Sequence, residues 1–283
     1  MEVKKVGVVG AGLMGSGIAQ VAAQAGYDVI LNDVETKFIE KGLKGIEKNL
    51  SRDVEKGRRT KDDMGVILGR ISITANLEHL AEVDVLIEAI FENMEAKKAL
   101  YARLDSICKP EAVLASNTSG LSITEIASAT KRPERIVGMH FFNPVPVMKL
   151  VEVIKGSDTS EDVFALAMEL SRKLGKEPIA VEEAPLFAVN RILVPMLNEA
   201  IFVLQEGIAS VEDIDKGMVL GANHPIGPLA LADLVGLDTL IMVIDTLYHE
   251  TGDSKYRACP LLRKLVRAGH YGRKTGRGFY QYN

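Results

Sequence analysis

A glycine motif near the N-terminus constrains the fold of this chain more than any other feature. In the stretch VGVVGAGLMGSGIAQ, Gly10, Gly12 and Gly15 are spaced as G-x-G-x-x-G after a β-type run and at the start of a helical one. In such a unit the first glycine permits a tight turn, the second admits a pyrophosphate close to the backbone, and the third lets helix and strand pack closely. The helix N-terminus adds N–H groups that favour phosphate. The motif therefore predicts a dinucleotide site, with a structural glycine turn as the plainer alternative.

An acidic residue after the second β-type run bears on which dinucleotide would bind. Asp33 lies 18 residues after Gly15. A carboxylate at this position accepts hydrogen bonds from the adenosine ribose hydroxyls and repels a 2′-phosphate. The residues that follow, Val34, Glu35 and Thr36, include no arginine that would bind such a phosphate. The sequence therefore predicts NAD rather than NADP as the cofactor.

Short β-rich runs alternate with helical stretches in the first part of the chain, which is typical of a parallel sheet covered by helices. From about Ala184 long helical segments replace them. We therefore expect an α/β fold: a Rossmann-like, doubly wound, mostly parallel sheet in an NAD-binding domain over residues 1–183, and a smaller all-α domain for substrate binding and dimerisation over residues 184–283. The expected strands are Val6–Val9, Tyr27–Asn32, Asp84–Ala89, Ala112–Ser116, Ile136–Phe142 and Val147–Ile154, and the expected helices include Met14–Ala25, Phe187–Gln205, Val211–Leu220, Leu237–Glu250 and Leu261–Ala268.

The composition is that of an ordinary globular protein, with 47% hydrophobic and 25% charged residues. A net charge of −4 gives no reason to expect nucleic acid or an anionic membrane as a partner. Polar residues interrupt the most apolar segment, Leu186–Leu204, which favours a buried helix over a membrane span. The N-terminus does not resemble a signal peptide, and two cysteines, Cys108 and Cys259, suit a reducing cytosol. We expect a cytoplasmic protein without a metal site, since no HExxH or CxxC pattern occurs.

The stretch GMHFFNPVPVMKLVEV, residues 138–153, places His140 inside an apolar run. A histidine in this context is more often a core residue with a hydrogen-bond partner than a base. Because proline cannot continue a sheet ladder, Asn143–Pro146 predicts a turn, and a reversal about Pro146 places position 140 opposite Glu152. A carboxylate on one ring nitrogen fixes the tautomer and stabilises an imidazolium, leaving the other nitrogen for substrate. The alternative to a core histidine is therefore a base for proton transfer.

Basic residues recur every four positions at Lys44, Lys48, Arg52 and Lys56. On a helix this spacing aligns the four charges along one face. A solvated helix face is one interpretation. The other is a binding surface for a highly phosphorylated ligand, because Lys and Arg bind phosphate oxygens through charge-assisted hydrogen bonds.

Several motifs in combination resemble the 3-hydroxyacyl-CoA dehydrogenases. They are GAGLMGSGIA with Asp33, ASNTSG at 115–120, GMHFFNPVPVMKLVE at 138–152 and EAPLFAVNR at 183–191. NHPIGPLALADLVGLD at 223–238 and GRKTGRGFYQY at 272–282 resemble the C-terminal domain of that family. The likeness extends nearly from end to end and is strongest to the short bacterial form that acts on 3-hydroxybutyryl-CoA. It implies hydride transfer between NAD(H) and an acyl-CoA substrate, and a homodimer formed through the C-terminal helical domain.

The resemblance also implies roles for individual residues. His140 would be the acid and base, Glu152 would hold its imidazole, and Ser119 and Asn190 would bind substrate oxygens near the reacting carbon. Arg52 and Lys56, together with Ser119, would contact the coenzyme A substrate. The positions that would contact NAD are Gly10, Gly12, Leu13, Met14, Gly15, Asp33, Glu92, Lys97, Asn117, Ser119, Asn143 and Lys274.

The chain departs from the family pattern at three positions. Leu186 stands where a glycine is usual, Ala188 replaces a larger β-branched residue, and Gly120 replaces a second serine. A leucine at position 186 would be strained if the backbone there needs a positive φ. The preferred acyl chain length is therefore not predicted.

Two other functions remain to be weighed. Short β-hydroxyacid dehydrogenases of the 3-hydroxyisobutyrate type share a similar glycine turn, but they use a catalytic lysine at the domain junction, and no lysine lies between Glu177 and Asn190. A non-catalytic, NAD-binding structural or sensor protein would not need to retain Ser119, His140, Glu152 and Asn190 together.

Overall fold

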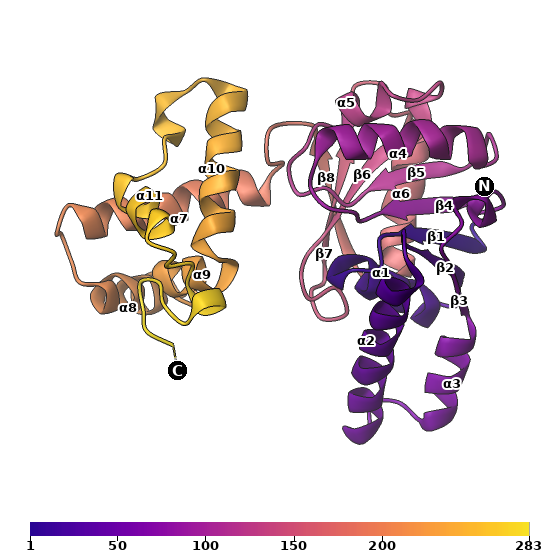
Figure 1. The fold of residues 1–283 in the computed structure, drawn as a ribbon, viewed down its shortest axis with the longest axis horizontal. Helices are drawn as coiled ribbons and strands as arrows, with labels where there is room; N and C mark the ends of the chain where they lie inside the picture. Colours follow the sequence, from indigo (N-terminus) through magenta and orange to yellow (C-terminus); the bar gives the residue numbers. More distant parts are fainter. Residues whose placement is uncertain (283) are drawn as a thin grey trace. The chain divides into compact units, whose positions relative to one another are not determined.

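The computed structural model describes residues 1–282 and divides the chain into two compact units, Met1–Ala184 and Pro185–Asn283. The first unit is an α/β layer structure and the second is made of helices (Figure 1). The prediction of a Rossmann-like sheet followed by an all-α region is confirmed.

The first unit contains one eight-stranded sheet in the order β3-β2-β1-β4-β5-β6-β7-β8. All neighbouring pairs are parallel except β6 and β7, which are antiparallel. The chain leaves β1 towards β2 on one side and returns to β4 on the other, so the carboxyl ends of β1 and β4 border a topological switch point, where sheets of this kind bind ligands. The strands are β1 (Lys5–Val9), β2 (Asp28–Asn32), β3 (Ile71–Thr74), β4 (Val85–Glu88), β5 (Val113–Ser116), β6 (Ile136–Phe141), β7 (Leu150–Lys155) and β8 (Glu177–Glu182).

The α-helices of this unit connect the strands and cover the sheet. Side-chain caps mark where three of them begin: Asn93 accepts a hydrogen bond from the N–H of Ala96 before α4, Ser122 accepts one from the N–H of Glu125 before α5, and Thr60 and Asp63 form a capping box before α3. The helices are α1 (Leu13–Gln24), α2 (Thr36–Glu55), α3 (Lys61–Gly69), α4 (Met94–Ile107), α5 (Ile123–Ala127) and α6 (Glu161–Lys173).

Three strand assignments from the sequence were wrong or missing. β7 begins at Leu150 rather than Val147, because the N–H groups of Val147 and Met148 both donate to the Pro144 carbonyl and close a turn there. β3 and β8, the two edge strands, were not predicted. An edge strand with partly exposed side chains lacks the continuous apolar run that identifies a central strand.

The second unit consists of α7 (Val189–Gln205), α8 (Val211–Gly221), α9 (Pro228–Val235), α10 (Leu237–Thr251) and α11 (Pro260–Arg267) around its own core. α7 begins at Val189 and not at Phe187 as predicted. Leu186 and Phe187 have φ angles of 63° and 59°, in the left-handed region that a right-handed helix cannot contain. Leu186 therefore adopts the conformation that a glycine would adopt more easily.

Two buried aspartates hold the C-terminal segment onto this helical core. Asp233 accepts hydrogen bonds from the N–H groups of Phe279 and Tyr280, at 3.0 and 2.9 Å, and from the hydroxyl of Tyr282 at 3.0 Å. Asp215 accepts from the hydroxyl of Tyr280 at 2.9 Å. The tail is thus an ordered part of the second unit through Tyr282.

Two further features follow from the described residues. None of the helices within residues 1–282 has both the length and the hydropathy needed to cross a membrane. Cys108 and Cys259 are free and buried, as expected, and burial raises the pKa of the Cys108 thiol to about 11.

Candidate active site

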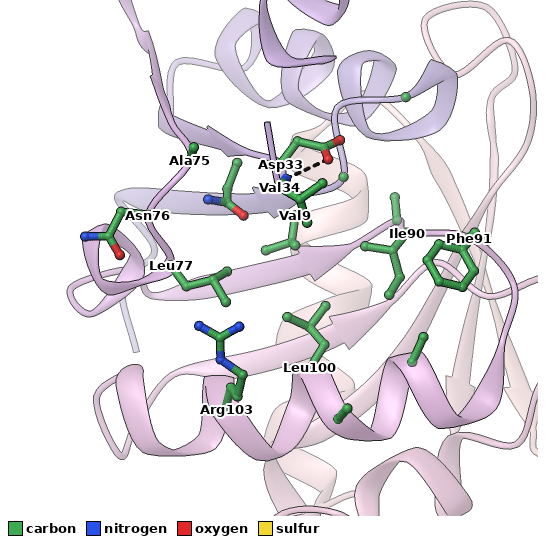
Figure 2. Close-up of a pocket in the computed structure, with 16 residues that line it drawn as sticks. Val9, Asp33, Val34, Ala75, Asn76, Leu77, Ile90, Phe91, Leu100 and Arg103 are labelled. Carbon is green, nitrogen blue, oxygen red and sulfur yellow. Dashed lines mark hydrogen bonds between the residues drawn. The ribbon is translucent and has the colours of Figure 1, made fainter. Parts of the chain in front are cut away.

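A cavity of about 650 Å³ opens beside the carboxyl ends of β1, β2 and β4 (Figure 2). Asp33 stands at its upper rim, and Leu77, Leu100 and Arg103 project into it from the opposite side. The predicted residues that line it are Gly10, Gly12 and Asp33, and the cavity is completed by Val9, Asn32, Val34, Ala75, Asn76, Leu77, Ala89, Ile90, Phe91, Ala96, Ala99, Leu100 and Arg103.

The three motif glycines are needed for different reasons. Gly10 has a φ of 99°, and a Cβ there would lie 2.5 Å from the Ala89 carbonyl oxygen. A Cβ on Gly15 would lie 1.7 Å from the Gly10 carbonyl oxygen, so the fold itself requires both glycines. A Cβ on Gly12 would meet no protein atom within 4 Å. Gly12 has ordinary backbone angles at the N-cap of α1, so the fold does not require a glycine there, and its bare backbone leaves room for a ligand.

Asp33 is fixed at the end of β2 by two backbone groups. Its Oδ2 accepts from the N–H of Ala11, and its Oδ1 from the N–H of Val34, both at 2.7 Å. Both bonds hold the carboxylate on the rim of the cavity beside the glycine turn. A dinucleotide with a free ribose diol fits this arrangement, because the diol donates to a carboxylate and the phosphates face the start of α1.

The pocket residues that escaped the sequence analysis include Asn76 and Leu77, which follow β3, and Leu100 and Arg103 on α4. Their segments are far apart in sequence and meet only because β2 and β4 flank β1 in the sheet. No spacing signal distinguishes them from ordinary helix and loop residues.

The structure brings His140 and Glu152 together as predicted. The two residues are register partners in the antiparallel pair β6–β7, and His140 Nδ1 lies 2.7 Å from Glu152 Oε2. Glu152 is 0% exposed and His140 6%. An ionised carboxylate only accepts hydrogen bonds, so Nδ1 carries the proton donated to Glu152, and Nε2 is the nitrogen suited to proton exchange.

Ser119 is held by a carboxylate from the β4–α4 connection. Glu92 Oε1 accepts hydrogen bonds from the Ser119 hydroxyl at 3.0 Å, from the Ser119 N–H at 2.8 Å and from the Thr118 hydroxyl at 2.6 Å. Asn117 links this loop to the histidine strand, because its Oδ1 accepts from the N–H of Phe141 at 2.9 Å. The loop after β5 is therefore held in a fixed position relative to β6, the strand that carries His140.

The remaining predicted residues lie on other parts of the molecule. Asn143 is exposed in the β6–β7 turn, while Asn190 is in the first turn of α7. Lys274 belongs to the second unit, where its Nζ donates to both oxygens of Asp238, at 2.9 and 3.1 Å, and to Thr239 at 2.9 Å.

The predicted basic face of α2 is solvent-exposed. Ile39, Ile46 and Leu50 on the opposite face of the helix are buried. Lys44, Lys48, Arg52 and Lys56 are all exposed, and none of them forms an ion pair within residues 1–282. The four charges are thus available to an anionic ligand.

Comparison with protein families assigns both units. Residues 5–184 match the NAD-binding domain of 3-hydroxyacyl-CoA dehydrogenase, and residues 187–282 match the C-terminal domain of the same enzyme. The chain belongs to the 3-hydroxyacyl-CoA dehydrogenase family. The predicted family and the NAD cofactor are therefore confirmed, and the protein is an NAD-dependent oxidoreductase.

Relatives across this family resemble the chain over its full length. The 3-hydroxybutyryl-CoA dehydrogenase of Clostridioides difficile is 53% identical over 279 residues, covering 99% of both chains. The crystal structure of (S)-3-hydroxybutyryl-CoA dehydrogenase from Ralstonia eutropha superposes with a TM-score of 0.98 at 48% identity, covering 100% of both chains. The human mitochondrial hydroxyacyl-coenzyme A dehydrogenase is 45% identical, covering 99% of this chain and 91% of its own.

Proposed function

We propose that this chain interconverts acetoacetyl-CoA and (S)-3-hydroxybutyryl-CoA with NAD(H) as the hydride carrier. The full-length similarity to dehydrogenases named for this substrate supports the substrate class. The observation that carries the proposal is the buried His140–Glu152 pair, because an alcohol cannot become a ketone unless its hydroxyl proton leaves as hydride departs from the same carbon.

His140 Nε2 takes the hydroxyl proton during oxidation and returns a proton to the carbonyl oxygen during reduction. The imidazolium formed in oxidation is stabilised by Glu152 at 2.7 Å, which also keeps the other nitrogen protonated before the reaction. Bound NAD supplies the hydride acceptor; the protein supplies position and electrostatics. A positioned base of this kind contributes about 10²–10⁴ in rate.

Other side chains bind and orient the two ligands. Ser119 and Asn190 hydrogen-bond the substrate oxygens near the reacting carbon, and Arg52 and Lys56 bind the coenzyme A phosphates. The exposure of the α2 charges supports the latter assignment. The residues proposed to hold NAD are Gly10, Gly12, Leu13, Met14, Gly15, Asp33, Glu92, Lys97, Asn117, Ser119, Asn143 and Lys274.

The first unit is the NAD-binding domain and the second serves substrate binding and dimerisation in this proposal. Large apolar side chains on the second unit support a homodimer formed through it: Leu220 is 74% and Ile192 72% exposed in the single chain. Light scattering of the purified protein tests the dimer, and a monomer at micromolar concentration would contradict it.

The activity is tested by mixing purified protein with NADH and acetoacetyl-CoA and following the nicotinamide absorbance. We expect rapid loss of NADH with the CoA thioester, and no formation of NADH when short free β-hydroxyacids are supplied with NAD. Turnover of the free acids alone would indicate the 3-hydroxyisobutyrate type instead. Absence of turnover with either, while NADH still binds, would indicate a non-catalytic NAD-binding protein.

A further inference from the structure

Glu88 is a buried carboxylate that the proposed chemistry does not use. It ends β4 and is 0% exposed. Three groups donate to it: the N–H of Ile90 at 2.7 Å and Lys97 Nζ at 2.6 Å, both to Oε1, and the Ser116 hydroxyl to Oε2 at 2.7 Å. A buried charge with this many donors is rigidly placed, since removing any partner leaves an unsatisfied polar group.

Lys97 lies between two carboxylates. Its side chain is 1% exposed, and its ammonium is 2.6 Å from Glu88 Oε1 and 3.5 Å from Glu92 Oε2. The two distances show that Glu88 holds the ammonium closely, while Glu92 is only loosely paired with it. Glu92 is therefore able to use its other oxygen, Oε1, for Ser119 and Thr118.

A continuous set of contacts thus joins the end of β4 to the substrate-binding loop: Glu88 to Lys97, Lys97 to Glu92, and Glu92 to the Ser119 hydroxyl and N–H. If Glu88 were neutral, Glu92 would be the remaining anion within 4 Å of Lys97 in residues 1–282. The ammonium would then draw the Glu92 carboxylate towards itself and away from Ser119.

We propose that Glu88 is a positioning residue for the dehydrogenase reaction: by holding Lys97 it keeps Glu92 hydrogen-bonded to Ser119, and so fixes the direction of the Ser119 hydroxyl at the substrate oxygen. This inference rests on the substrate-binding role of Ser119 in the proposed function. Glu88 is 0% exposed, so in this proposal it acts on the substrate only through other side chains.

The test is Glu88→Gln, which keeps the size of the side chain and removes its charge. We expect kcat for acetoacetyl-CoA reduction to fall about tenfold, the rate factor of one misdirected hydrogen bond. Because Glu88 acts through Ser119, the loss must disappear in a Ser119→Ala background: the double variant E88Q/S119A reacts as fast as S119A. Equal fractional losses in both backgrounds would overturn the proposal.

Asp84 provides a matched control at the opposite end of the same strand. It immediately precedes β4, accepts from the N–H groups of Lys4 and Lys5, and pairs with Lys109. Asp84→Asn therefore also removes the charge of a carboxylate paired with a lysine on this sheet. We expect D84N to lower Tm without changing kcat. If D84N lost as much kcat as E88Q, the effect of E88Q would be explained by a general loss of stability and not by a positioning role of Glu88.

Two further measurements keep the proposal decidable. Should E88Q fail to fold, Glu88→Asp keeps a negative charge facing Lys97 on a shorter side chain. We expect a smaller kcat loss, which again vanishes when Ser119 is replaced by alanine. A loss that persists in the S119A background would refute the coupling. A crystal structure of the variant is independent of activity: Glu92 must approach Lys97 and leave Ser119 Oγ. An inactive wild-type enzyme would refute the proposed function, while an unmoved Ser119 in that crystal structure would refute the role of Glu88.

Discussion

Replacement of Glu152 by glutamine tests the centre of the proposed mechanism. Glutamine keeps the shape of the side chain and an acceptor oxygen, so the neutral imidazole keeps its tautomer, while the stabilisation of the imidazolium is lost. A hydrogen bond to a charged group contributes about 1.5–3 kcal/mol, and this one is short, at 2.7 Å, and almost fully buried. Taking about 2 kcal/mol from the transition state lowers kcat about thirtyfold.

The assay is kcat for oxidation at saturating (S)-3-hydroxybutyryl-CoA and NAD, the direction in which the imidazolium forms, with the NADH dissociation constant and Tm measured on the same preparations. We expect NADH binding to change little, because the glycine turn and Asp33 are untouched. His140→Gln should lower kcat by about two or more orders of magnitude, and the double variant H140Q/E152Q should be no slower than H140Q, since the two residues act as a unit. A kcat for E152Q within threefold of wild type would refute the reasoning.

Three other predictions concern separate parts of the molecule. Neutralising Arg52 and Lys56 together should raise KM for the CoA thioester about tenfold, but not for a pantetheine thioester without the nucleotide; equal effects on both would indicate damage to the fold. In denaturant unfolding, Leu186→Gly should be more stable than Leu186→Ala by about 1 kcal/mol, because φ is 63° there and glycine adopts this angle without strain. Alanine variants are usually more stable than glycine variants, and that result here would contradict the left-handed conformation. Burial acts to raise the pKa of Asp84, but hydrogen bonds from Lys109 and two backbone N–H groups outweigh it and hold the pKa below 3.8. A carboxyl group whose pKa is lower in the folded than in the unfolded chain stabilises the fold at every pH above the unfolded pKa. This stabilisation is lost as the pH falls through the folded pKa. The Tm deficit of D84N at pH 7 should therefore shrink below about pH 4, and a constant deficit would contradict the linkage.

The sequence determined those features whose physical cause is local. The glycine turn is one, because the φ of 99° at Gly10 and the contact between Gly15 and the Gly10 carbonyl both arise within a single strand–turn–helix unit. The pairing of His140 with Glu152 is another: the two residues are 12 apart, and proline forces the reversal that aligns them. Short loops leave few alternative registers, so chain order and turn chemistry were sufficient.

Tertiary structure alone decided which distant segments meet. The far wall of the cofactor cavity joins residues after β3 to α4, and no local pattern encodes that meeting. The sequence marks Glu88 only as the end of an apolar strand, and its burial against Lys97 and Ser116 exists because β4 and β5 are neighbours. Likewise, the left-handed backbone at Leu186 opposes the intrinsic preference of leucine. Local preferences contribute about 1 kcal/mol or less per residue, and long-range packing overrides them.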